Sequence, residues 1–330
     1  MAGAALLYIL LLTAITNFEA ARPGGTRSLP VLTALVPVAL LVLMLNSLLN
    51  GESIGPGGDA SLRMLTAVAG LVSALATIGL IWSDRPWPWV ARAVRLASHF
   101  EQVSFNPRSS VHRLAAVVLI CAIVALSWQA LSASAIEELT FVDAVGAAPQ
   151  LLASLLLHAV LASLGVGWLT RRDWAAVKQR LGLRWPRRTD WLAGLAAAIS
   201  LHLIVALALA FWQSVTEPSA FESQVRGARM LLENLSSPLL LGALLAMSVG
   251  VGEEILFRGA LQPIFGLAIS SLLFVAMHLQ YSFTPAALIL LVVSLGFGLL
   301  RTRYSTTAAI IAHAAYNAIP FALSGMAAFR

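Results

Sequence analysis

Residues 238–278 read PLLLGALLAMSVGVGEEILFRGALQPIFGLAISSLLFVAMH, an almost unbroken apolar run that nevertheless carries charged side chains. The same character continues to Ser324, and the whole stretch contains Glu253, Glu254, Arg258, His278, His313 and Asn317. An ionisable group inside an apolar span costs about 2.5–3.5 kcal/mol on insertion scales, and such groups normally face a bundle interior or a wet cavity. The stretch therefore predicts a polar site enclosed among membrane helices, where chemistry or transport takes place.

The composition of the whole chain agrees with a membrane protein. Of its 330 residues, 59% are hydrophobic and only 11% are charged, against about 25% charged in a soluble domain. The apolar runs are long and unbroken, whereas a β-barrel would alternate over segments of about ten residues. We therefore predict an all-α, polytopic transmembrane helical bundle. The single cysteine, Cys121, excludes an intrachain disulfide and a cysteine-based metal site.

A transmembrane helix needs about 20 mostly apolar residues. A search for segments of this length and character predicts about ten spans. The candidates are roughly 2–19, 30–49, 62–82, 114–135, 150–170, 190–213, 237–257, 263–280, 285–301 and 306–324. The first of them has no cation before Arg22, whereas a cleaved signal peptide carries a positive segment ahead of its apolar core. We therefore expect a retained first span.

The basic residues predict the orientation of the chain. With the N-terminus outside, the inside segments hold 17 of the 21 Lys and Arg residues, Arg258 among them, and the outside segments hold 4. This asymmetry favours a multi-pass protein with its N-terminus outside. Because the chain is rich in Arg and Ala and Lys178 is its only lysine, we expect a bacterial inner membrane. Because the basic residues lie between spans, the net charge of +6 is explained by topology, and no nucleic-acid partner is expected.

Two regions are expected, with a boundary near residue 190. Residues 1–189 hold five spans of unassigned role and two basic inner loops, 83–113 and 171–190, which mix Arg with Trp and aliphatic residues. Each loop could be a plain topology anchor or an amphipathic helix at the anionic inner surface. Residues 190–330 hold the polar motifs. The histidines His158 and His202, outside these motifs, are interpreted as hydrogen-bonded core or interface residues.

The polar residues of the later spans have helical spacing. Glu254 and Arg258 are four residues apart and share a helix face, so they can pair, while Glu253 lies about 100° away around the helix. His313 and Asn317 are again four residues apart. Along straight helices Glu253 and His313 reach similar depths, but His278 lies about 22 Å from the inner surface. Tilted or broken helices are therefore needed to bring His278 to the other residues.

Two kinds of chemistry suit this set. His278, His313, Asn317 and Glu253 could hold a divalent metal such as zinc with one open water position. Alternatively, Glu253 takes a proton from water without a metal, while histidine and asparagine stabilise the oxyanion. Both routes lead to amide hydrolysis by activated water.

The motifs Glu-Glu-x-x-x-Arg at 253–258, Phe-x-x-x-His at 274–278 and His-x-x-x-Asn at 313–317 resemble the CPBP family of CAAX-protease and bacteriocin-processing intramembrane peptidases. The resemblance covers about residues 235–322. It implies a CPBP-type peptidase core within 190–330 and a peptide or protein substrate in the lipid bilayer. It further implies that Glu253 activates water with support from Glu254 and Arg258, and that the remaining residues are metal ligands or oxyanion donors, namely His278, His313 and Asn317.

Two other functions use the same residues. A proton-coupled transporter would use Glu253, Glu254 and the histidines as a relay, but it predicts inverted repeats that the sequence does not contain. A non-catalytic immunity or scaffold protein would retain the site without turnover. We expect the endopeptidase, acting on a membrane-associated peptide or protein tail.

Overall fold

The computed structural model describes residues 2–20, 33–38, 60–98, 101–131, 144–219, 221–222, 225, 239–278 and 284–327. All regular elements in this part are helices joined by turns and loops, and the extended pairing is limited to an isolated bridge between Trp168 and Arg172. Among the described residues, five helices are long and apolar enough to cross a membrane. The predicted class, a multi-pass helical membrane protein, is confirmed at this level, while the full count of ten spans stays a prediction.

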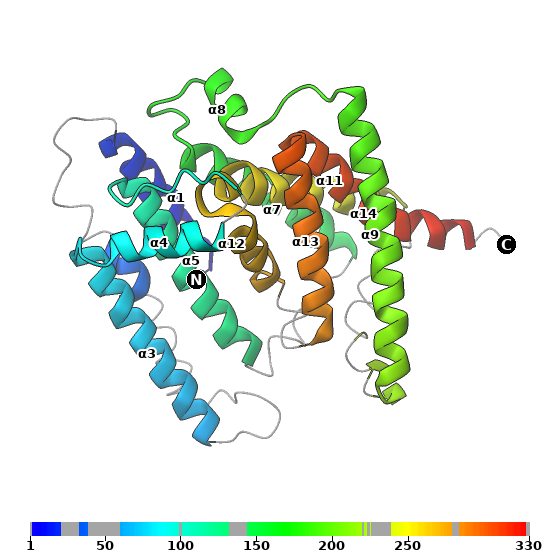
Figure 1. Ribbon diagram of the computed structural model, residues 1–330, viewed down its shortest axis with the longest axis horizontal. Coiled ribbons are helices and arrows are strands. Elements are labelled where there is room, and N and C mark those ends of the chain that lie inside the picture. The colour runs from blue at the N-terminus through cyan, green and yellow to red at the C-terminus, as the bar shows by residue number, and fades with distance from the viewer. Residues whose placement is uncertain are drawn as a thin grey trace.

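The first half of the chain forms α1 (Ala2–Ala20), α3 (Ala60–Trp82), α5 (Ser110–Leu131) and α7 (Ala144–Gly165) (Figure 1). These helices coincide with four of the five spans predicted before residue 190. The predicted span 30–49 lies mostly outside the described residues, and only 33–38 is seen as helix. α1 packs against α5 and α7, and α7 packs against the helices of the second half.

Both basic inner loops contain short helices whose apolar faces pack on the protein. In α4 (Trp87–Ala97) the buried residues Trp87, Ala91 and Val94 recur at helical spacing. Trp87 and Val94 share a hydrophobic cluster with residues of α12, which lies against α4 (Figure 1). In α8 (Trp174–Leu181), Val177 and Leu181 are fully buried in a cluster with residues of α7. Both loops therefore contain a helix, and the apolar stripe of each helix is buried within the bundle. The position of these helices at the anionic inner surface stays a prediction.

The break between the seventh and eighth spans, predicted at 258–262, lies later in the structure, at Gly266. Instead of an inner loop at Arg258, α11 (Leu239–Glu254) continues into a π-helical segment, η1 (Ile255–Leu261), and then into α12 (Gln262–Ala276). Arg258 and Gln262 lie inside this continuous helix and are fully buried. The search for apolar segments of about 20 residues predicted a loop around Arg258, because it treats buried residues as apolar. Arg258 and Gln262 are buried as polar residues because they are hydrogen-bonded within the bundle.

A sharp bend occurs later, at Gly266 inside α12. Its backbone has φ 85° and ψ 169°, a conformation that essentially only glycine adopts. The bend separates 262–265 from 267–276 and redirects the second half of α12. It supplies the broken helix that the position of His278 requires.

Replacing Gly266 with alanine is expected to lower the free energy of unfolding by about 1–3 kcal/mol, the cost of holding a side chain in a strained backbone region. The new Cβ would also collide with the Ser98 hydroxyl. Denaturant titration of the purified protein in mild detergent measures the change. Gly79→Ala in α3 is the control, because open space surrounds that position and alanine favours a helix. Equal effects of the two substitutions would contradict the expectation.

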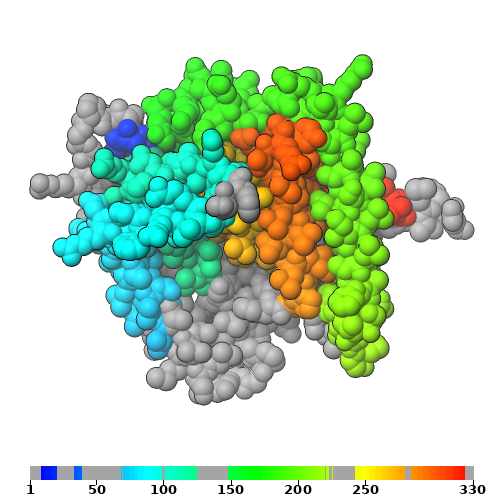
Figure 2. Space-filling model, viewed as in Figure 1, coloured from blue at the N-terminus to red at the C-terminus, as the bar shows by residue number. Residues whose placement is uncertain are grey.

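The remaining helices are α9 (Arg188–Val215), α13 (Pro285–Arg303) and α14 (Thr306–Ala327). α14 packs between α11 and α9, and α13 packs against α12 and α14. α9 forms one edge of the molecule (Figures 1 and 2), and it exposes Leu192, Leu203, Leu207 and Phe211, as a lipid-facing helix does. The buried Asp190 accepts hydrogen bonds from Arg184 Nη2 at 2.7 Å and from Ser305 Oγ at 2.9 Å, which ties the start of α9 to the start of α14.

Candidate active site

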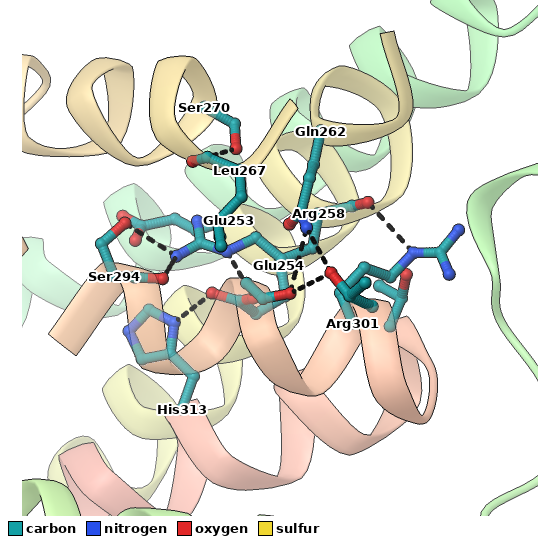
Figure 3. Close-up of polar contacts among 12 residues, drawn as sticks. Glu253, Glu254, Arg258, Gln262, Leu267, Ser270, Ser294, Arg301 and His313 are labelled. Atoms are coloured by element: carbon teal, nitrogen blue, oxygen red, sulfur yellow. Dashed lines mark hydrogen bonds and ion pairs between the residues drawn. The ribbon is translucent and has the colours of Figure 1, made fainter. Parts of the chain in front are cut away.

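Glu254 lies at the centre of a fully buried polar group (Figure 3). Its Oε1 is 2.9 Å from His313 Nδ1 on α14, and its Oε2 is 3.3 Å from Arg258 Nε one turn further along the same helix. The pairing predicted from the spacing of Glu254 and Arg258 is therefore present. Because Glu254 has a charged partner on one side and an imidazole on the other, it is suited to holding other groups in place.

Arg258 is anchored through its side chain and through its backbone carbonyl. Its Nη2 donates to the carbonyl oxygen of Ser294 at 2.8 Å and to Ser294 Oγ at 2.9 Å, and its guanidinium lies 4.7 Å from the Phe274 ring centre. Its own carbonyl accepts from Arg301 Nε at 3.2 Å (Figure 3). These contacts join η1 to α13, and they compensate a buried charge that would otherwise be costly.

Glu253 and His278 form the second, more accessible pair. Glu253 Oε2 is 4.0 Å from His278 Nε2, and the two side chains retain 16% and 18% exposure. His278 Nδ1 is 2.8 Å from the Phe274 carbonyl oxygen, which can only accept, so Nδ1 carries a proton. In the neutral ring the lone pair of Nε2 therefore faces Glu253.

Aromatic rings hold both histidines. Phe274 lies 4.6 Å from the His278 ring and 5.9 Å from the His313 ring, measured between ring centres. Phe297 of α13 stacks on His313 with centres 4.6 Å apart and an interplanar angle of 22°. The orientation of each imidazole is thus fixed by packing as well as by its hydrogen bond.

The structure brings together five of the six residues selected from the sequence. They form two groups, one around each of the two carboxylates. His278 faces Glu253, whereas His313 contacts Glu254, which also pairs with Arg258. Asn317 lies one turn beyond His313 on α14 and is partly buried. Within the described residues no hydrogen bond joins Asn317 to the group, and its role stays a prediction.

His158 of α7 lies closer to this site than sequence reasoning indicated. A methyl group placed on Gly252 would be 3.5 Å from His158 Nδ1, so the imidazole packs on the residue directly before Glu253. Ser154 Oγ is 3.3 Å from the same nitrogen. The sequence signal, a serine four residues before a histidine in an apolar span, is too common to single out this position. His202, by contrast, packs on Tyr316 with ring centres 4.3 Å apart.

The metal-binding interpretation has no support from the donor geometry. Among the described residues no three side chains of the His, Cys, Asp and Glu types are placed to hold a metal ion. His313 Nδ1 is engaged by Glu254, and Glu253 and His278 provide only two donors. A zinc site formed by Glu253, His278, His313 and Asn317 stays a prediction.

Replacing Gly250 with alanine is expected to weaken the site from outside it. The new Cβ would lie 2.8 Å from the backbone nitrogen of Ala314, so α11 and α14 would have to separate and the Glu254–His313 contact would lengthen. Overpacking of this kind costs about 1–3 kcal/mol, which denaturant titration measures. Gly165→Ala, where nothing lies within 4 Å of the new Cβ, should be near neutral. A neutral Gly250→Ala would show that the two helices are not in close contact.

These features define a class of protein: a multi-pass helical membrane protein with paired carboxylates and histidines enclosed among its spans. Residues 235–319 match the family model described as type II CAAX prenyl endopeptidase Rce1-like. The match covers about a quarter of the chain, and over this region it confirms the resemblance to the CAAX-protease (CPBP) family noted from the motifs. Neither a curated protein nor a solved structure matches the chain.

Proposed function

We propose that the protein is an intramembrane endopeptidase that hydrolyses a peptide bond with water activated by Glu253. The observation that carries the proposal is the Glu253–His278 pair, which is partly exposed and lies beside the fully buried group of Glu254, Arg258 and His313. One carboxylate is held by permanent partners, and the adjacent one is free to exchange a proton with a substrate.

The separation of the pair suits a bridging water molecule. At 4.0 Å, Glu253 Oε2 and His278 Nε2 are too far apart for a direct hydrogen bond, but one water can donate to both atoms through bonds of ordinary length. Glu253 takes one proton as the water oxygen attacks the scissile carbonyl carbon. A tetrahedral oxyanion forms, and the C–N bond then breaks as Glu253 returns the proton to the leaving amine. His278 orients the water in this sequence.

An apolar cavity lined by residues close in sequence to Glu253 and His278 supports a hydrophobic substrate. It has a volume of about 210 Å³ and lies between η1 and α12 on one side and α1, α5 and α7 on the other. Leu256 and Phe257, just after Glu254, line it, and so does Met277, which precedes His278. The matching family model is named for prenyl substrates. For this chain we propose the broader class of a membrane-associated peptide or protein tail with an apolar segment.

The proposed topology has about ten spans in a bacterial inner membrane, with the N-terminus outside. In support of a single basic face, Thr306 Oγ1 at the start of α14 donates to the Leu181 carbonyl of α8 at 2.6 Å, and Arg301 at the end of α13 lies against Gly182. Basic segments that are distant in the sequence thus meet on one side of the bundle, as the positive-inside rule requires.

A purified-protein assay tests the proposal. The full chain in lipid nanodiscs is incubated with quenched fluorogenic peptides that carry apolar C-terminal segments, with and without a farnesyl group. Each incubation is repeated with a metal chelator and with added zinc, and the metal content of the protein is measured. Cleavage supports the endopeptidase, and chelator-sensitive cleavage supports the zinc-assisted form. Flux driven by a proton gradient without cleavage would indicate a transporter, and neither activity would indicate a scaffold.

A further inference from the structure

The bend in α12 is held from outside the family-matched region. Where the helix is interrupted at Gly266, its backbone groups need partners other than their own helix. Ser98 Oγ donates to the Phe265 carbonyl at 3.0 Å. Ser104 donates through both its backbone nitrogen and its hydroxyl to the Pro263 carbonyl, each at 2.9 Å. The carbonyl groups before the bend are thus satisfied by the segment that follows α4.

Glu101, from the same segment, bridges the bend with its two carboxylate oxygens. After the bend, Oε2 accepts from the Leu267 backbone N–H at 2.7 Å. Before the bend, Oε1 accepts from Gln262 Nε2 at 3.0 Å, and the Thr302 hydroxyl donates to the same oxygen at 3.3 Å. Gln262 is fully buried and also donates to the Gly298 carbonyl at 3.0 Å. One side chain therefore connects both halves of α12 with α13.

The Glu101 carboxylate lies where a negative charge is electrostatically favourable. The second half of α12 begins at Leu267, so its first N–H groups form the positive end of a helix dipole, where a carboxylate is stabilising. A hydrogen bond to a charged acceptor is also stronger than a neutral one. His278 follows directly after this half of the helix, and its distance from Glu253 on α11 therefore depends on the angle at the bend.

We propose that Glu101 is a positioning residue that fixes the bend of α12 and thereby holds His278 opposite Glu253. The proposal rests on the proposed function for its effect on turnover, but its effect on structure is independent of turnover. It also gives part of residues 1–189 a role: the segment after α4 completes a site whose recognised motifs all lie within 235–319.

The test uses the full chain in lipid nanodiscs. The wild type is compared with the variants Glu101→Ala and Glu101→Gln and with the control variant Asp84→Ala. Asp84 is an exposed carboxylate on the neighbouring loop and pairs with Arg113 at 2.5 Å. Hydrogen–deuterium exchange is followed in peptides covering 262–278 and, for reference, 239–254. Glu101→Ala should accelerate exchange in 262–278 at least tenfold, because a hydrogen bond to a charged group is lost. Glu101→Gln, which retains one acceptor oxygen, should have a smaller effect, and Asp84→Ala none.

The same variants are assayed for cleavage and for modification of His278 by diethyl pyrocarbonate. Glu101→Ala should lower kcat about tenfold with KM changed less than twofold, and it should speed modification of His278. Unchanged exchange in 262–278, or faster exchange with unchanged kcat, overturns the proposal. If the wild type cleaves no peptide, the proposed function fails, and exchange together with His278 modification still decides the role of Glu101. If Glu101→Ala does not accumulate, Glu101→Gln serves in the same comparison.

Discussion

Glu253→Gln is expected to lower the rate of peptide cleavage by about 10²–10⁴-fold, the usual contribution of a positioned general base. Glutamine has the same shape as glutamate but cannot accept a proton from water at neutral pH. The partly exposed side chain of Glu253 should allow the amide to replace the carboxylate without loss of folding. Cleavage of the fluorogenic peptides by purified protein measures the rate, and circular dichroism with thermal unfolding checks the fold.

The matched control for Glu253→Gln is Glu222→Gln, because Glu222 is an exposed carboxylate far along the chain from the site. It should leave cleavage within a factor of two of the wild type. Cleavage that persists in Glu253→Gln would show that another group activates the water, and Glu254 would be examined next. The same loss in both variants would point to a general effect on expression or insertion.

Arg258→Met is expected to destabilise the protein by about 3–5 kcal/mol, the cost of leaving a buried charge without its partner. Glu254 would keep only its contact with His313, and Ser294 would lose the guanidinium that donates to its carbonyl and hydroxyl oxygens. Methionine fills a similar volume, so the effect reports mainly on the charge. Denaturant titration in detergent measures the change in the free energy of unfolding.

A second variant separates charge from packing at Arg258. Glu254→Gln combined with Arg258→Met removes both buried charges, and it should recover part of the lost stability, because replacing a whole buried pair costs less than breaking it. Arg303→Met, at the exposed end of α13, should be near neutral. A double variant less stable than Arg258→Met alone would contradict the assignment of Glu254 and Arg258 as a compensated pair.

The sequence was sufficient to locate most helices and the residues of the polar group. Apolar windows match α1, α3, α9, α13 and α14 closely, because span length is set by bilayer thickness. Helical spacing predicted the Glu254–Arg258 contact, since residues four apart meet on one face. Which histidine meets which carboxylate depends on how three helices pack, and spacing within one helix carries no information on that.

The features that the sequence did not reveal depend on tertiary contacts. Arg258 looked like a loop residue because its partner Ser294 could only be paired with it once α13 and η1 were placed side by side. Gly266 is one of 23 glycines. Its neighbouring residues do not indicate whether this glycine allows a bend in the helix or a close contact with another helix. Glu101 binds Leu267 across 166 positions of the chain, which no local pattern predicts.

The most direct test of the account is a double-mutant cycle at the accessible pair, measured as single-turnover cleavage by Glu253→Gln, His278→Ala and the double variant. If one water is held between these two side chains, each single change should lower the rate strongly. The double variant should then be little slower than Glu253→Gln alone, because residues that act as a unit are not additive. Rate losses that multiply in the double variant, or wild-type rates in His278→Ala, would contradict a shared water between Glu253 and His278.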